Sequence, residues 1–456
     1  MFGLPMWIVL IFLFMLGAVI GSFLNVCIHR IPMHERTLDA WRGLTHPPSR
    51  CPSCLTPIRA YDNVPIFGWL WLRGRCRTCK HAISFRYPAI ELFNALLFVL
   101  VYWLEVPSGY NVGIQGSSVY DALGPTGNWG TWLTPTMLVN LRYAYHMVLI
   151  EMLVAATFID FDLRIIPDAV TLPAMAVGIF GGWAIGQLYI VPLWFQGRDW
   201  IHLVSGLYTV NGHPVPQWLQ QQLLFSTEMV PAWIKVYPHT HGLLVSLAGF
   251  LVGGGVVWLV RIIGHWVLRQ EAMGFGDVIL MATIGSFLGW QPTLVVFFLA
   301  PVCALVVVAG TILFARQREI PYGPYLSLAT LIVICCWKQI GPAATRIFEL
   351  GPLIPVMAAA MTILLVVSLQ LVQGVKRLLG IELYPPDFTE EWNSGDQLTY
   401  LAGEWTDPEQ GQWRREHWQG LRSSTGQAPY NDWRREPPMP SAAGWRQHWQ
   451  RRNGSS

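Results

Sequence analysis

Charged side chains are scarce in this chain of 456 residues. Only 12% of the residues are Asp, Glu, Lys or Arg, whereas 53% are hydrophobic. Soluble domains carry about 25% charged residues, so the composition excludes a single soluble domain and indicates a membrane protein with soluble portions. The net charge of +3 is small, and the basic residues gather in a few segments. We therefore expect them to orient the chain in a membrane, and we expect no nucleic-acid partner.

Several familiar catalytic motifs are missing. The sequence has no Gly-x-Ser-x-Gly elbow, no His-Glu-x-x-His and no phosphate-binding loop, which argues against the enzyme classes that those motifs mark. The first 27 residues are apolar, with no basic residue before the run and no small-residue cleavage site. We expect this segment to be retained as a first membrane span rather than removed as a signal peptide.

Long apolar runs dominate the remainder of the chain. A helix that crosses a bilayer needs about 20 such residues, so we predict an all-α, polytopic helix bundle with eight or nine transmembrane helices. The ninth would be a short run at 278–290, which is able to span only if it packs inside the bundle. The other predicted spans are 6–27, 87–105, 137–159, 169–190, 241–264, 293–315, 324–341 and 352–373.

Basic residues between the spans predict the topology. Residues 30–86 hold ten Lys or Arg and three acidic residues, 106–136 hold no Lys or Arg, and 191–240 hold two. Cytoplasmic loops are enriched in Lys and Arg, so 30–86 should be cytoplasmic and the other two loops external. We expect four parts: 1–28 as the first span, 29–86 as a cytoplasmic loop domain, 87–373 as a membrane core with outer loops 106–136 and 191–240, and 374–456 as a polar tail.

Four of the eight cysteines form two Cys-x-x-Cys pairs, Cys51 with Cys54 and Cys76 with Cys79. Two such knuckles supply the four thiolates of a closed, tetrahedral structural zinc site. Two disulfides or four free thiols are the alternatives, and a reducing cytoplasmic loop disfavours disulfides. The loop is too small to build much of a core, so we predict a Zn²⁺ ion that stabilises it.

Two acidic residues next to apolar runs are the candidates for chemistry. Asp160 ends the run 147–159, and Asp277 closes Gly274-Phe275-Gly276-Asp277 before the run at 278–290. Acidic groups at membrane depth are functional candidates by default, and the span count places both at the cytoplasmic face. Two adjacent carboxylates can share one proton and activate a water. Gly274 and Gly276 would permit close backbone approach and unusual dihedral angles beside Asp277.

Other polar residues have structural interpretations. Asp162 and Asp168 are expected to cap helices or to lie in a wet loop, with Asp168 well placed to cap the helix that follows. Glu91 is near enough in sequence to pair with Arg86. Tryptophans of the outer loops would anchor the protein to membrane lipids. The Trp/Arg-rich tail from 374 is predicted to be largely disordered, with docking to a partner or to lipid headgroups as the alternative.

Six segments in order carry a resemblance to a known family. The sequence resembles the type IV prepilin peptidases, also called prepilin leader peptidase/N-methyltransferases, which are intramembrane aspartic peptidases of the Gly-x-Gly-Asp type. The matching segments are the opening signature 21–32, the two cysteine knuckles with 63–66 and 69–70 between them, the entry to the second span 86–91, the first aspartate motif 158–168, the second aspartate motif 274–277, and the closing motif 320–326.

This resemblance implies a bacterial inner-membrane enzyme that cuts the basic leader from type IV prepilins and type II secretion pseudopilins. The catalytic pair would be Asp160 and Asp277, with Gly274, Gly276 and Asp168 in support, and the zinc loop and active site would face the cytoplasm. Many members also methylate the new N-terminus from S-adenosylmethionine, but the motifs do not assign the residues that bind it. Asp162, Asp168 and Glu271 would help to dock the basic leader.

The chain departs from the family in two places. Ile279 stands where members usually have Lys, two residues after the second aspartate, and the tail from 374 has no recognisable counterpart. Two rival hypotheses stay open. One is a presenilin-like Gly-x-Gly-Asp protease that cuts inside transmembrane helices, which has no need of a Cys₄ loop. The other is a non-enzymatic, zinc-stapled scaffold of a pilus or secretion assembly.

Overall fold

The regular elements in the part of the chain that the computed structural model describes are helices. That part comprises residues 5–106, 135–193, 205–217, 237–268, 273–314, 321–348 and 353–378, without positions 35, 46, 47, 52 and 55 and with the isolated residues 220 and 233. No strand occurs within these residues, only two isolated β-bridges, Arg50 with Pro57 and Arg75 with Ala82. The all-α prediction is therefore confirmed.

Eight helices are long and apolar enough to cross a membrane, which confirms the predicted number of eight or nine. The ninth candidate is α12, at Phe275–Leu288. Short helices outside the candidate spans include α2 (Thr37–Thr45) and α3 (Phe67–Trp71). The eight long helices are α1 (Met6–Arg30), α4 (Arg86–Glu105), α6 (Pro135–Leu163), α7 (Asp168–Ile185), α11 (Pro238–Leu268), α13 (Trp290–Phe314), α14 (Gly323–Phe348) and α15 (Leu353–Leu378).

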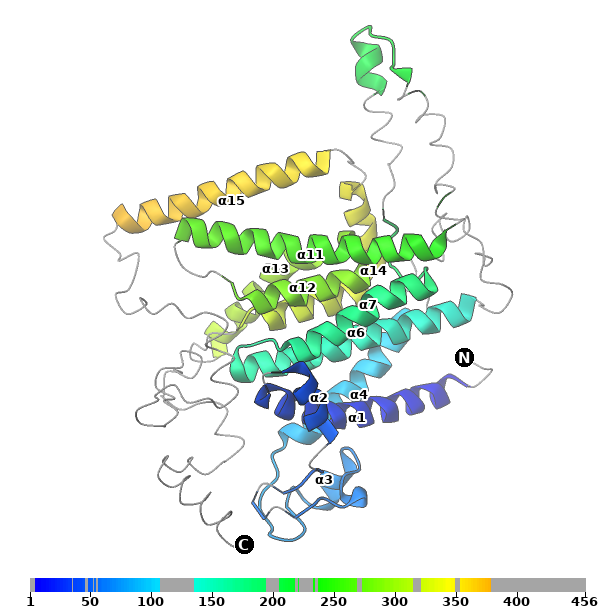
Figure 1. The fold of residues 1–456 in the computed structure, drawn as a ribbon, viewed down its shortest axis with the longest axis vertical. Helices are drawn as coiled ribbons and strands as arrows, with labels where there is room; N and C mark the ends of the chain where they lie inside the picture. The colour runs from blue at the N-terminus through cyan, green and yellow to red at the C-terminus, as the bar shows by residue number, and fades with distance from the viewer. Residues whose placement is uncertain are drawn as a thin grey trace.

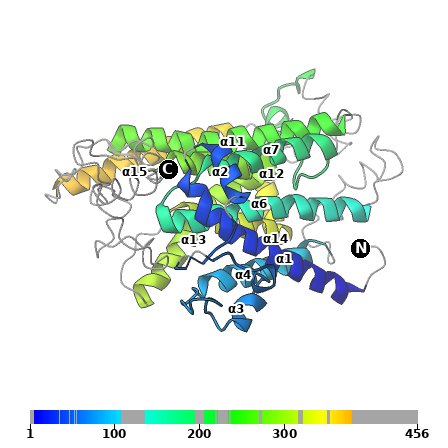
Figure 2. The ribbon, with the colours of Figure 1, turned by 60° about the horizontal axis from the view of Figure 1, so that its bottom comes forward.

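The long helices lie side by side in one bundle (Figure 1). α1 pairs with α4 at one edge, α6 and α7 follow, and α11 packs along α12 towards the other edge. α15 lies outermost there against α11. The segment that contains α3 and the four paired cysteines projects beyond α1 and α4 at the opposite edge, as Figure 2 also shows.

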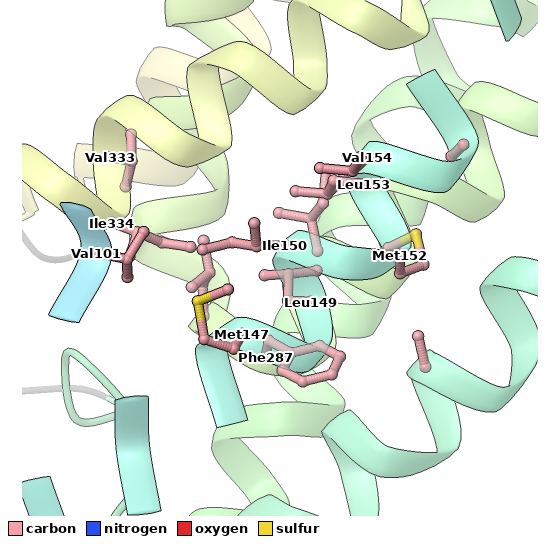
Figure 3. Close-up of a cluster of buried hydrophobic side chains, with 14 of the residues drawn as sticks. Val101, Met147, Leu149, Ile150, Met152, Leu153, Val154, Phe287, Val333 and Ile334 are labelled. Atoms are coloured by element: carbon pink, nitrogen blue, oxygen red, sulfur yellow. The ribbon is translucent and has the colours of Figure 1, made fainter. Parts of the chain in front are cut away.

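The core is built around α6. Leu149, Ile150 and Ile159 of this helix are 0–2% exposed, and they pack with side chains of α12 and α14, such as Phe287 and Ile334 (Figure 3). By contrast, the apolar window of α15 has no buried residue. An apolar helix with no buried face is what lipid contact requires, so α6 is the interior helix and α15 a peripheral one.

α12 is shorter than a helix usually needs to be to cross a membrane. Its 14 residues give a rise of about 21 Å, less than the roughly 30 Å of a hydrocarbon core. Every residue from Leu280 to Leu288 is buried inside the bundle. The helix ends at Gly289, whose φ of 81° lies in a region that glycine adopts readily. The condition set for a span at this short run, packing inside the bundle, is therefore met, and this packing fixes the position of the first turn, where Asp277 lies.

Candidate functional site

Asp160 lies near the end of α6 and is only 5% exposed. Its neighbour Ile159 is fully buried, and Leu163, the last residue of the helix, is 4% exposed. A carboxylic acid held among such residues has lost most of its water, so its remaining polar neighbours determine its charge state.

Asp277 comes from a different helix and lies near Asp160. It lies in the first turn of α12 and is partly buried. The two carboxyl groups are near enough to interact electrostatically. The structure therefore brings together two acidic residues that are 117 positions apart in the sequence.

The glycines beside Asp277 act differently from the prediction. Gly274 is extended, with φ of −67° and ψ of 152°, and Gly276 is helical, so the predicted unusual dihedral angles are wrong. A Cβ at Gly274 would have nothing nearer than 4.0 Å, but one at Gly276 would lie 3.1 Å from Cβ of Ile166. Close approach is therefore a property of Gly276 alone, and it brings α12 against the segment that follows α6.

A third helix completes the cluster. The backbone N–H of Gly323, the first residue of α14, donates a hydrogen bond to the Asp160 carboxylate. A Cβ on Gly323 would lie 2.5 Å from Oδ2 of Asp160, which leaves no room for one. Tyr322 interacts electrostatically with Asp277. The closing motif, which the sequence singled out without assigning it a role, thus reaches both acidic residues.

The flanking acidic residues have their own partners. Asp162 accepts two hydrogen bonds from Arg86, of 2.8 and 2.6 Å, in a paired geometry. The expected pairing of Arg86 with Glu91 and the wet loop expected for Asp162 are both wrong. Asp168 is the first residue of α7 and not its cap, because Pro167 occupies that position. Its charge still lies where a helix dipole favours it. Glu271 lies outside the described residues.

Glu91 joins the loop segment to the membrane helices instead. Its Oε2 accepts the N–H of Ile66 at 2.6 Å. Ile66 has φ of 62° and ψ of −54°, and the N–H of Phe67 bonds to the carbonyl of Pro65 at 2.6 Å. This is a strained γ-turn that a non-glycine residue adopts only where its surroundings hold it. The Glu91 carboxylate is the contact that holds it here.

The four paired cysteines form one cluster. Their sulfur atoms all lie within 4.8 Å of one another, with Cys51 to Cys79 at 3.7 Å and Cys54 to Cys76 at 3.9 Å. Tetrahedral Zn²⁺ with Zn–S bonds of about 2.3 Å needs sulfurs about 3.8 Å apart. The donor set and its spacing therefore fit a zinc ion, and the cluster contains no disulfide.

Backbone contacts in the loop hold the cysteine pairs in position for metal binding. Each knuckle is closed by a bridge, Arg50 with Pro57 and Arg75 with Ala82, so the two halves have the same local geometry. Hydrogen bonds from Thr56 lower the pKa of the Cys54 thiol to about 6, and backbone N–H groups lower the pKa of Cys76, whereas burial raises the pKa of Cys51 to about 11. Thiolates are the zinc ligands, so two of the four positions already favour the binding form.

A second cluster of buried charged side chains was not predicted from the sequence. Glu105 at the end of α4 is 0% exposed and accepts from Nε of Arg142 at 3.0 Å, while Nδ1 of His146 lies 2.8 Å from the same oxygen. Arg142 is 18 residues before Asp160, which is about 27 Å along α6. The cluster therefore lies at the other end of the bundle. A charged residue inside the run 137–159 was the available signal.

Comparisons with known proteins agree with the geometry. Residues 15–104 match the model of the bacterial peptidase A24 N-terminal domain, and residues 217–309 match that of the type IV leader peptidase family. The second match includes Asp277, and Asp160 lies between the two. No solved structure matches the chain significantly.

Relatives with assigned names align with most of the chain. A prepilin leader peptidase/N-methyltransferase of Aeromonas salmonicida is 31% identical over 73% of this chain and 92% of its own length. The protein of the same name from Aeromonas hydrophila is 30% identical with the same coverage. A type 4 prepilin-like proteins leader peptide-processing enzyme of Escherichia coli O78:H11 is 29% identical over 70% of this chain and 90% of its own length.

Proposed function

Because the chain belongs to the type IV leader peptidase family, we propose that it is an intramembrane aspartic endopeptidase that removes the leader peptide from prepilins. One observation carries the aspartic mechanism. Asp160 and Asp277, on two helices distant in sequence, lie near enough to interact electrostatically. A pair of carboxyl groups is the chemical requirement for this class of peptidase.

The pair would work by sharing one proton. The carboxylate without the proton removes a proton from water while the water oxygen bonds to the peptide carbonyl carbon, and the protonated partner gives its proton to the carbonyl oxygen. The resulting gem-diol collapses when its C–N bond breaks. The leaving nitrogen receives the proton taken from water, and a gem-diol hydroxyl returns a proton to the other carboxylate. Each aspartate thus ends in its starting state.

The substrate class comes from the relatives. Their names specify prepilins and prepilin-like proteins, and we extend this to type II secretion pseudopilins as the same chemical class. We place the site at the cytoplasmic face of the bacterial inner membrane, because the positive-inside bias puts the ten basic residues of 30–86 on that side. Asp162 is bound to Arg86, so Asp168 is the better candidate of these two for contact with a basic leader.

We also propose that the enzyme methylates the new N-terminus. The relatives that carry both activities in their names support this, as does the Cys₄ loop. S-adenosylmethionine would supply the methyl group when bound. Ile279 stands where the family usually has Lys. Methylation must therefore be measured separately from cleavage.

Two alternatives differ in what they predict. A presenilin-like protease would cut within a transmembrane helix and would have no use for the Cys₄ loop. A zinc-stapled scaffold would bind pilins without cutting them. Two acidic residues near enough to interact electrostatically inside a helix bundle favour an enzyme over the scaffold, because acidic groups at membrane depth are costly without a function.

The test is cleavage of a co-expressed prepilin in cells where this chain is the sole processing enzyme. Asp160→Asn and Asp277→Asn should each insert normally and leave the prepilin uncut. Asp39→Asn is the matched control, because Asp39 lies on α2 and its side chain is 49% exposed. Mass spectrometry of the mature pilin N-terminus reports cutting and methylation together. Normal cutting by either Asn variant would reject the proposal.

A further inference from the structure

The short helix α3, between the two cysteine pairs, has an exposed apolar side. The side chains of Phe67, Leu70 and Trp71 are 64%, 55% and 83% exposed. Residues three and four apart are neighbours on a helix surface, so these three side chains form one surface, which we call the α3 face. Single exposed apolar residues are ordinary, but three large ones gathered on one side of a helix indicate a contact surface.

The opposite side of α3 is held in place by the loop. Nε1 of Trp69 donates a hydrogen bond to the carbonyl of Ile83 at 3.0 Å, and the Trp69 ring packs edge-on against Phe85, with centroids 5.6 Å apart. Gly68 is buried, and the carbonyl of Asp62 leaves no room for a Cβ there. These contacts fix the orientation of the helix, so the α3 face stays directed away from the loop interior.

Two contacts set the depth of α3 relative to the membrane. Trp69 packs on Phe85, which directly precedes α4, and the N–H of Ile66 bonds to Glu91 in the second turn of α4 at 2.6 Å. The 20 residues of α4 rise about 30 Å, which is the thickness of a hydrocarbon core. The first turns of α4 therefore lie where the chain enters the bilayer, and α3 lies at the same level.

The segment that contains α3 also lies beside the bundle. Figures 1 and 2 show that it lies within the length of α6 and not beyond the helix ends. In a membrane, lipid surrounds the side of a bundle. Phe93 and Leu96 of α4 are 46% and 53% exposed and Phe85 is 65% exposed, as contact with lipid requires. The α3 face therefore has lipid as its neighbour at the level of the headgroups.

Basic residues follow the α3 face in the sequence. Residues 66–86 contain five Lys or Arg and no acidic residue. Two of the five pair with acidic residues elsewhere in the chain. The other three, Arg73, Arg75 and Lys80, are exposed. Basic residues next to a membrane span are attracted to anionic headgroups, so the charges of this segment favour the same neighbour as its apolar side chains.

We propose that the α3 face is a membrane-docking surface for a bilayer that contains anionic phospholipids. The α3 face enters the interface between headgroups and acyl chains, while Arg73, Arg75 and Lys80 bind the headgroup phosphates. Aromatic and aliphatic side chains beside basic residues are typical of interfacial anchors. A basic prepilin leader fits this surface less well, because the three exposed charges would repel it.

The test measures the depth of the α3 face in a bilayer. The full-length protein carries a nitroxide at position 71, attached through a ketone-bearing amino acid in place of Trp71, so that the cysteines are unchanged. It is placed in nanodiscs of phosphatidylcholine with phosphatidylglycerol, without prepilin. Electron paramagnetic resonance then compares collisions of the nitroxide with oxygen, which concentrates in lipid, and with a nickel complex, which stays in water.

We expect collisions with oxygen to exceed collisions with nickel at position 71. The control carries the label in place of Arg42 on α2, whose side chain is 82% exposed and therefore matches Trp71 in exposure, and which lies beside Asp39. There, collisions with nickel should dominate. Dominant nickel collisions at position 71 would place the α3 face in water and would overturn the proposal. Few collisions with either reagent would mean that protein covers it, which would overturn the proposal as well.

A second comparison tests the basic residues. In the combined variant Arg73→Gln, Arg75→Gln and Lys80→Gln, collisions with nickel at position 71 should increase, because the attraction to phosphatidylglycerol is lost. In nanodiscs of phosphatidylcholine alone, the variant and the parent protein should agree. Equal depth in both lipid mixtures for the parent protein would overturn the role of these charges.

Two features keep the result interpretable. If the label in place of Trp71 prevents folding, the same label in place of Phe67 reports on the same surface. The measurement records position in the bilayer and requires no cleavage, so its outcome is independent of whether the proposed peptidase activity is correct.

Discussion

Gly249 of α11 and Gly285 of α12 touch backbone to backbone. A Cβ on Gly249 would lie 1.9 Å from the carbonyl oxygen of Gly285, and a Cβ on Gly285 would lie 2.0 Å from that of Gly249. In lipid, the hydrophobic effect does little to pull helices together, and small residues permit the close packing that replaces it. Because α12 is short and carries Asp277 in its first turn, this contact fixes where one of the two proposed catalytic groups lies.

We therefore expect Gly285→Ala to separate the two helices. The added methyl group should destabilise the protein by about 1–3 kcal/mol and should lower cleavage, since Asp277 moves with α12. Thermal unfolding in detergent and prepilin cleavage in cells measure the two effects. Gly255→Ala on α11 is the control, because a Cβ there would meet nothing within 4 Å. Equal behaviour of the two variants would mean that the contact does not determine the position of α12.

Much of the fold was predictable because it depends on local composition. Apolar runs of sufficient length gave the spans, and two Cys-x-x-Cys pairs gave the sulfur cluster. The pairings between helices were not predictable in the same way. Arg86 is near Glu91 in sequence but binds Asp162, which is 76 residues away. Nothing local distinguishes these acidic partners, because the choice depends on which helices become neighbours.

The site shows the same division. An acidic residue beside an apolar run is costly to place at membrane depth and is therefore a functional candidate. For this reason Asp160 and Asp277 could be identified from the sequence. The contact of Gly323 with Asp160 could not, because a glycine at a helix start is common and its partner lies on another helix. Glu105 ends an apolar run, where charges are usually solvated, and Arg142 lies inside the predicted span 137–159, but only the packed structure shows that the two are buried against each other.

That buried pair leads to a stability prediction. Arg142 and Glu105 have side chains that are 2% and 0% exposed, with Nε and Oε1 3.0 Å apart. Removal of Glu105 leaves the buried charge of Arg142 uncompensated, so Glu105→Leu should cost about 3–5 kcal/mol of folding free energy. Arg142→Met should cost less, because Glu105 keeps His146, whose Nδ1 lies 2.8 Å from the same oxygen. The double variant should cost much less than the sum, because no charge is left alone.

Thermal unfolding of the four proteins of this double-mutant cycle, in one detergent, measures the coupling. Arg42→Met is the control. Arg42 is 82% exposed and forms a surface ion pair with Asp39 at 3.7 Å. Such a pair should contribute about 0–1 kcal/mol to stability. Additive effects of Arg142→Met and Glu105→Leu would contradict the pairing as a source of stability.

The sulfur cluster gives the last prediction. Its spacing fits Zn²⁺ in a closed Cys₄ shell, which leaves no open position for catalysis. Elemental analysis should find one zinc per chain in the wild type and none in Cys54→Ser, while Cys336→Ser on α14 keeps its metal. Without the ion the loop should lose its packing, and trypsin should cut faster after the exposed Arg73, Arg75 and Lys80. Lower pH should release the metal as well, since protons compete for the thiolates.

Prepilin cleavage should survive in Cys54→Ser, because Asp160 and Asp277 belong to other elements. Loss of cleavage together with zinc, in a protein that still inserts, would show that the loop takes part in peptide-bond hydrolysis.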